Sequence, residues 1–260
     1  MFFSSCTDYL AKKTTQAFIF CDKPVDAKLV VIAFRGTEPF DADDWSTDLD
    51  FSWYKMGSIG KVHVGFLEAM GLADRCDEDI LKSHLELKRE DVNQDRDIAG
   101  LPEEYASEDH EKAVAYYAIR RRLSGLLEEH KNAKFVVTGH SLGGALAVLF
   151  PAILILHKNT QLMEKLLAVY TFGQPRIGDK EFGNFMNIKL NEPVTRYLRV
   201  VYSNDMVPRM PFDNKLFLFK HFGVCLYYNS RYKEKVLISY QPLTPSIFLL
   251  CLSATWNLQA

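Results

Sequence analysis

The stretch KFVVTGHSLGGALAVLF, at residues 134–150, contains the pattern that decides the fold expected of this chain. It begins with KFVVT, a β-branched and aromatic run typical of a buried strand, and ends in ALAVLF, which is apolar all round, as in a buried helix. Between them, a Gly-X-Ser-X-Gly sequence places Ser141 on a very short connection from strand to helix. Backbone atoms crowd together at such a turn, so Gly139 and Gly143 must lack side chains. The sequence therefore predicts a sharp turn that lifts the Ser141 hydroxyl out of the sheet.

This turn gives Ser141 the setting of a nucleophile. A serine hydroxyl reacts only when a base takes its proton, and an acyl intermediate needs fixed donors for its oxyanion. One donor comes with the turn, because the backbone N–H of Leu142 opens the following helix. A glycine-rich turn without chemistry is the alternative, and the flanking strand and helix argue against it. We therefore predict acyl-transfer chemistry at Ser141, without a metal or a cofactor.

The rest of the chain has the organisation of an α/β protein. Helical patterns separate the later strand-like runs, which indicates a mostly parallel central sheet with flanking helices. One helix is expected from Ser107, a candidate N-cap, to His130. A second is expected from Leu142 to His157, where Pro151 either kinks the helix or ends it early. The strand-like runs lie at residues 16–20, 28–34, 134–138, 168–172 and 196–202.

Composition narrows the class of protein. The 260 residues fit one α/β domain, and 31 Lys and Arg against 33 Asp and Glu leave a net charge of -2, too little positive field for nucleic acid. The five cysteines are odd in number and have no zinc-ligand spacing, which is typical of reduced thiols in an intracellular protein. The N-terminus lacks a secretory signal, and no window reaches the roughly 18 apolar residues of a membrane span. We expect a cytoplasmic protein whose lipid contacts, if any, come from apolar surface.

Residues 74–111 differ from the rest of the chain. They are dense in charge and poor in large apolar side chains. Such a composition is typical of a solvated insertion, so no chemistry is assigned to this segment.

Several ordered blocks of the sequence stand out: VVIAFRGTEPFDADDWSTDLDFSWY at 30–54, GKVHVGF at 60–66, GHSLGG at 139–144, VYTFGQPRIGD at 169–179 and RYLRVVYSNDMVPRMP at 196–211. With these blocks in this order, the chain resembles the fungal-type (class 3) lipases from about residue 15 to about residue 235. Within that family, the stretches FRGTEPFDADDWSTD and FKHFGVCLYYNSRY are most similar to the plant lipid-droplet (oil-body) triacylglycerol lipases.

The resemblance implies an α/β-hydrolase fold and a serine ester hydrolase that cleaves acylglycerols at a lipid-droplet or membrane surface. It also implies that Thr37 supplies the second oxyanion donor through its backbone N–H, and that the segment after Thr37 carries a mobile lid. Large apolar side chains alternate there with aspartates, from Phe40 to Tyr54, a mixture suited to exchange between protein and lipid surfaces. His63 matches a structural histidine of the family. The His140 side chain must point away from that of Ser141 at such a turn, so we expect it to pack and hydrogen-bond, and neither histidine is assigned to the site.

The acid is expected at Asp205. In α/β-hydrolases the catalytic residues follow the order serine, acid, histidine along the chain. Asp205 lies directly after the strand-like run 196–202, at the place where the family keeps its aspartate. If Asp205 pointed to the other edge of the sheet, Asp179 would be the next candidate.

The base is where the pattern breaks. His221 is the only histidine after Asp205, and its block matches a noncatalytic position, so we expect it not to bridge Ser141 and Asp205. From residue 236 the chain no longer resembles the family, which suggests a hydrolase domain at 1–235, a divergent tail at 236–260 and shortening at both ends. Two alternatives stay open: a catalytically silent lipid-binding or regulatory protein, and a class 3 phospholipase or galactolipase.

Overall fold

The computed structural model describes residues 4–6, 15–36, 53–57, 59–73, 84, 114–211 and 219–238. Residues 37–52, which include most of the predicted lid, lie outside these ranges, as do most of the charged segment 74–111 and the tail beyond residue 238. The strands are β1 Ser4–Cys6, β2 Ala17–Cys21, β3 Leu29–Phe34, β4 Trp53–Lys55, β5 Lys61–His63, β6 Lys134–His140, β7 Leu166–Phe172, β8 Tyr197–Tyr202, β9 Val224–Tyr228 and β10 Glu234–Ile238. The helices are α2 Val64–Ala69, α5 Ala115–Glu129, α6 Leu142–Leu156, α7 Thr160–Lys165, α8 Lys180–Asn191 and the 3-10 turn η3 Val207–Arg209.

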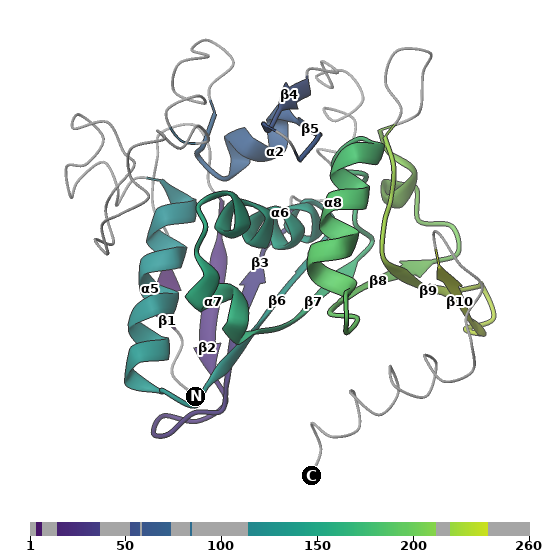
Figure 1. Ribbon diagram of the computed structural model, residues 1–260. Coiled ribbons are helices and arrows are strands. Elements are labelled where there is room, and N and C mark those ends of the chain that lie inside the picture. Colours follow the sequence, from purple (N-terminus) through teal and green to yellow (C-terminus); the bar gives the residue numbers. More distant parts are fainter. Residues whose placement is uncertain are drawn as a thin grey trace.

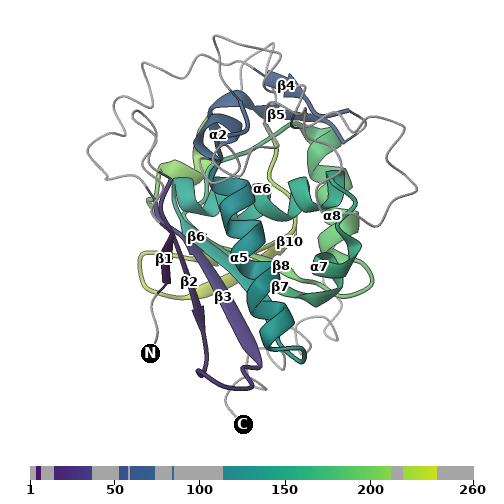
Figure 2. The same ribbon diagram turned by 90° about the vertical axis from the view of Figure 1, so that its left-hand side faces the viewer.

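Eight strands form one sheet in the order β1-β2-β3-β6-β7-β8-β9-β10 (Figures 1 and 2). The strands from β3 to β9 run parallel, whereas β1, β2 and β10 are antiparallel to their neighbours. All five runs predicted as strands are strands of this sheet, and the mostly parallel α/β fold is confirmed. β10 continues to Ile238 and so crosses the boundary expected between residues 235 and 236.

One end of the sheet is covered by the two-stranded unit β4–β5 and by α2, as Figure 1 shows. The backbone of Gly178, after β7, bridges Val62 of β5 on one side and Lys220 on the other. The ring of Trp53, which the sequence placed in the lid, stacks on Phe219 with centroids 4.1 Å apart. This unit is therefore tied to the segments that follow β7 and precede β9.

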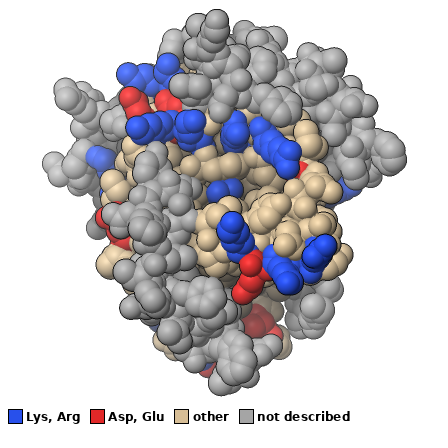
Figure 3. Space-filling view, turned by 90° about the vertical axis from the view of Figure 1, so that its right-hand side faces the viewer, with Lys and Arg blue, Asp and Glu red and all other residues tan. Residues whose placement is uncertain are grey.

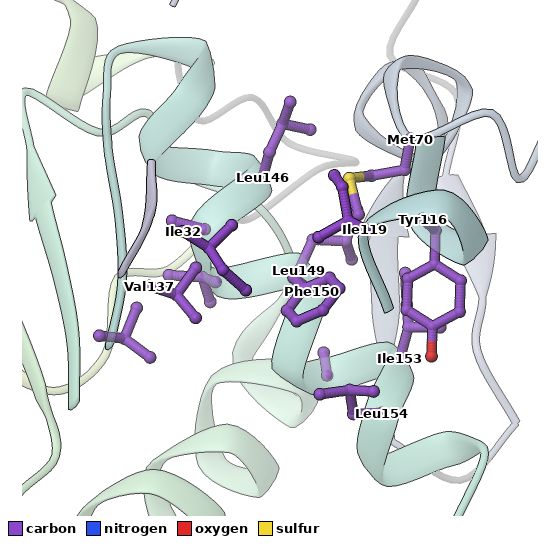
Figure 4. Packing of buried hydrophobic residues seen from close by; sticks show 14 of the residues in the cluster. Ile32, Met70, Tyr116, Ile119, Val137, Leu146, Leu149, Phe150, Ile153 and Leu154 are labelled. Carbon is purple, nitrogen blue, oxygen red and sulfur yellow. The ribbon is translucent and has the colours of Figure 1, made fainter. Parts of the chain in front are cut away.

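Helix α6 forms the centre of the core. Twelve of its residues are buried, as its uniformly apolar sequence predicted, and it continues through Pro151 to Leu156. Figure 4 shows Phe150 between the sheet residue Ile32 and the ring of Tyr116 on α5. The Phe150 ring centroid is 6.1 Å from that of Phe34 and 5.6 Å from that of Tyr116. The helix that follows the Ser141 turn is therefore held from both sides.

Helix α5 begins later than the sequence suggested. The prediction of Ser107 as its N-cap is wrong, because α5 starts at Ala115 with Val114 in an extended conformation before it. Val114 is buried against Gly71, and the N–H of Tyr116 donates to the carbonyl of Met70. A neighbouring chain segment thus satisfies the first turn of this helix in place of a side-chain cap.

A buried polar cluster joins α5 to the end of α6. His157 Nε2 lies 2.8 Å from the backbone oxygen of His84, and His157 Nδ1 lies 3.1 Å from Tyr116 Oη. A carbonyl can only accept, so Nε2 carries the proton and Nδ1 accepts from the tyrosine hydroxyl. Burial lowers the pKa of His157 to about 4, with a smaller contribution from the positive charge of Arg120 and an opposing one from the carbonyl of His84. The neutral ring is the form that the fold selects.

The core position of α6 predicts a large loss of stability on truncation. Ile153→Ala, at a fully buried α6 position, should lower the free energy of unfolding by about 2–5 kcal/mol. Ile188→Ala on α8, where 54% of the side chain is exposed, should change it by about 0.5 kcal/mol or less. Denaturant unfolding of both variants measures the difference, and equal losses would contradict the central position of α6.

The low pKa of His157 predicts a pH-dependent stability. Above pH 6.5 the ring is neutral in both states, whereas between pH 6.5 and about 4 the unfolded chain binds a proton that the folded chain excludes. The free energy of unfolding should fall through this window as the pH falls, by up to about 3 kcal/mol from this ring. In His157→Gln this part of the slope should disappear. Parallel stability curves for the two proteins would show that His157 titrates normally.

Candidate active site

Ser141 lies on the turn between β6 and α6, where the sequence predicted it. Its backbone adopts φ 54° and ψ -124°, a conformation that side-chain-bearing residues rarely take. A Cβ atom on Gly139 would lie 2.1 Å from the carbonyl oxygen of Gly143, and one on Gly143 would lie 2.3 Å from that of Phe34. Neither position has room for a side chain. The Ser141 N–H donates to the carbonyl of Phe172 at 2.9 Å, which fixes the turn against β7.

Backbone donors for an oxyanion begin at Leu142. This residue opens α6, and among the described residues its N–H donates to no acceptor, as expected at the start of a helix. The loop after β3 lies close by, since a Cβ atom on Gly36 would be 3.4 Å from the Ser141 Cβ. Thr37, the expected second donor, lies outside the described residues.

Asp205 follows β8 on the same edge of the sheet. Its N–H donates to the carbonyl of Tyr202, and its Oδ1 accepts from the N–H of Val207 at 3.0 Å. A Cβ atom on Gly173, at the end of β7, would lie 2.5 Å from Asp205 Oδ2. Gly173 has φ 54° and comes directly after the carbonyl that holds Ser141. The carboxylate therefore occupies a place beside the Ser141 turn that only a glycine at 173 leaves open.

His221 does not connect these two residues. Its Nε2 lies 2.7 Å from the carbonyl oxygen of Pro208 and so carries a proton that it donates there. A triad histidine uses both ring nitrogens, one for the serine and one for the acid. The expectation that His221 does not bridge Ser141 and Asp205 is confirmed. Burial lowers the pKa of His221 to about 3, helped by the nearby charges of Arg199 and Arg176 and opposed by the bond to Pro208.

Three further polar residues were considered from the sequence: Asp179, His63 and His140. Asp179, the alternative acid, caps α8 and accepts from the N–H groups of Phe182 at 2.9 Å and Lys61 at 3.1 Å. His63 is buried, and its Nδ1 accepts from the N–H of Gly65 at the start of α2, as expected for a structural histidine. His140 is exposed, so the expectation that its side chain is packed is wrong. Its Nε2 lies 3.3 Å from the place where a Cβ atom on Gly173 would stand.

Sequence reasoning missed two polar residues behind the turn. A Cβ atom on Gly144 would lie 3.0 Å from the Cβ of Gln174, and Tyr197 Oη donates to Gln174 Oε1 at 2.6 Å. Gln174 and Tyr197 are 2% and 0% exposed. The only signal in the sequence was the polar Gln174 between Gly173 and Pro175, directly after a strand.

The surface around the turn is apolar, with basic groups beyond it. Phe172 and Met206, next to Gly173 and Asp205, are 44% and 51% exposed. Figure 3 shows Lys and Arg gathered on the face that carries α8, β9 and β10. None of the helices in the described part of the chain has the length and apolar character of a membrane span. The same residues contain no group of three or more side chains that could hold a metal ion.

Comparison with known proteins agrees with this geometry. Residues 31–215 match the model of the family described as lipase (class 3). The chain is 54% identical over 235 residues to the triacylglycerol lipase OBL1 of Arabidopsis thaliana, covering 90% of this chain and 44% of that protein. It is 51% identical over 221 residues to the protein of the same name from Ricinus communis, covering 85% of this chain and 42% of that protein. The chain thus spans less than half the length of these relatives.

Solved structures share the fold at lower identity. The lipase of Rhizomucor miehei in its propeptide complex superposes with a TM-score of 0.61 at 23% identity, covering 94% of this chain and 62% of that chain. The lipase of Rhizopus microsporus var. chinensis gives a TM-score of 0.60 at 22% identity, covering 91% of this chain and 66% of that chain. With the family model matched over residues 31–215 and an α/β-hydrolase fold around the Ser141 turn, the chain belongs to the class 3 lipase family.

Proposed function

We propose that this chain forms the serine ester hydrolase domain of a class 3 lipase and acts on acylglycerol esters. The observation that carries the proposal is the conformation of Ser141, held at φ 54° between β6 and α6. A backbone strained in this way costs of order 1–3 kcal/mol and serves to present a nucleophile. In a turn without a catalytic role, this backbone strain at Ser141 would have no function.

The proposed chemistry is acyl transfer through a covalent intermediate. The Ser141 oxygen attacks the ester carbonyl, and the carbonyl oxygen becomes an oxyanion. The serine proton must pass to a base held beside Asp205, a role that His221 does not fill because it donates to Pro208. The N–H groups of Leu142 and Thr37 stabilise that oxyanion, and the alcohol leaves with the proton that the base returns. Water then releases the fatty acid from Ser141. Asp205 is the acid that orients the base.

The substrate class follows from the relatives and from the surface. Both relatives are named triacylglycerol lipases, and the exposed side chains of Phe172 and Met206 offer apolar contacts beside Ser141. We propose triacylglycerol as the substrate and a peripheral, intracellular association with a lipid droplet or membrane.

One observation favours a second candidate, a lipid-binding protein without turnover. His221, the histidine that follows Asp205 in this sequence, donates to Pro208 and so is not placed to serve as the base. A serine hydrolase that lacks one member of its triad keeps only roughly 10³–10⁴-fold acceleration over water. Residues 1–235 would then hold lipid and regulate a partner without cleaving ester bonds.

Labelling by a fluorophosphonate probe tests the nucleophile. The purified chain should be labelled, and Ser141→Ala should abolish labelling, because the probe needs an activated serine. Ser124→Ala on α5 is the matched control and should leave labelling unchanged.

Hydrolysis of emulsified triolein, compared with phospholipid and galactolipid, then measures the head-group preference. Absence of labelling in the unchanged protein would favour the lipid-binding candidate.

The base is tested through His221. The substitution His221→Gln should leave the labelling rate unchanged, since this ring is bonded to Pro208 and its low pKa keeps it neutral at ordinary pH. Free imidazole should accelerate labelling of the unchanged protein by supplying a base beside Asp205, and Asp205→Asn should weaken that effect. If His221→Gln abolished labelling without loss of folded protein, the triad would be Ser141, Asp205 and His221.

A further inference from the structure

A buried chain of hydrogen bonds lies behind the Ser141 turn. Tyr197 Oη donates to Gln174 Oε1 at 2.6 Å, and Gln174 Nε2 donates to the carbonyl of Pro175 at 3.1 Å. The Thr171 hydroxyl is fully buried and lies beside the Tyr197 hydroxyl. These polar groups lie in an otherwise apolar region, where a buried polar group without a hydrogen bond lowers the stability of the fold.

Contacts on the ring and backbone of Tyr197 fix the direction in which its hydroxyl points. Its ring is fully buried and packs on Phe222 with centroids 4.7 Å apart. A Cβ atom on Gly223 would lie 2.6 Å from the Tyr197 Cδ1, so the segment before β9 presses directly on this ring. The Tyr197 N–H donates to Asn191 Oδ1 at 3.1 Å. The hydroxyl is therefore presented to Gln174 from one direction.

Gln174 in turn meets the first turn of α6. A Cβ atom on Gly144 would lie 3.0 Å from Gln174 Cβ and 3.3 Å from Gln174 Cγ, so the glutamine fills the space that a side chain at 144 would take. The Gly144 N–H donates to the carbonyl of Ser141 at 2.9 Å, and that of Ala145 donates to the same oxygen at 3.3 Å. A shift of Gln174 would reach the Ser141 carbonyl and the Leu142 N–H through this turn.

We propose that Gln174, oriented by Tyr197, is a positioning residue that sets the first turn of α6 and thereby the Leu142 N–H that faces the oxyanion. The proposal rests on the function proposed above, because that function gives the Leu142 N–H its task. An amide suits this place better than an apolar side chain of similar size. It is held at both ends, by the Tyr197 hydroxyl and the Pro175 carbonyl, whereas an apolar chain would choose among rotamers.

Two variants and one matched control test the proposal in the full chain. Tyr197→Phe removes the donor to Gln174, and Gln174→Met removes both hydrogen bonds at similar volume. Tyr116→Phe is the control, because Tyr116 is equally buried and also loses one hydrogen bond, to His157 at the C-terminal end of α6. All three should lose thermal stability to a similar extent.

Hydrogen exchange at Gly144 and Ala145 is the deciding measurement. Exchange there should be about tenfold faster in Tyr197→Phe and Gln174→Met than in Tyr116→Phe, because only the first two free this turn. The fluorophosphonate labelling rate should fall at least tenfold in the same two variants and not in the control. The double variant should be no worse than Gln174→Met alone, since the two residues act as one unit.

The two hypotheses fail in different ways. If the unchanged protein is not labelled, the proposed function fails, while the exchange rates still decide the role of Gln174. If Gly144 and Ala145 exchange at the same rate in Tyr197→Phe as in Tyr116→Phe, the hydrogen-bond chain contributes only stability, and the positioning role is overturned.

Discussion

Backbone crowding between β6 and the first turn of α6 governs the arrangement of the whole site. Gly139 and Gly143 touch each other's backbone, and Gly143 also lies against the carbonyl of Phe34 on β3. The resulting conformation of Ser141 costs of order 1–3 kcal/mol. Burial of a single large apolar side chain contributes about 1.5–3 kcal/mol, and α6 buries several, among them Leu149, Phe150 and Ile153. The helix that begins at the strained turn therefore holds the strain in place.

The same crowding explains why the other site residues come from loops on one edge. β7 pairs with β6 and supplies the Phe172 carbonyl that receives the Ser141 N–H. The next residue, Gly173, then leaves room for the carboxylate that arrives from the end of β8. Parallel strands carry their carboxyl ends to a common edge, so nucleophile and acid meet although they lie far apart in sequence.

Much of this could be predicted because its causes are local in sequence. The strands are short β-branched runs, and the Ser141 turn depends on glycines within two residues of the serine. Asp205 could be named from chain order and from its place after a strand. The start of α5 could not, since it depends on a contact between Val114 and the distant Gly71. The pairing of Tyr197 with Gln174 and of His221 with Pro208 likewise joins residues that no pattern connects. The Thr37 donor remains a prediction.

The strand order of the sheet has a consequence for how the chain is made. From β1 to β10, omitting the separate pair β4–β5, each strand lies beside the one that precedes it in the sequence. A chain emerging from the ribosome can therefore extend the sheet from one edge to the other without inserting a late strand between early ones. β3, β6 and α6, which enclose Ser141, are synthesised before β8 and Asp205. The segments that form the Ser141 turn are thus complete in the nascent chain before the strand that carries Asp205.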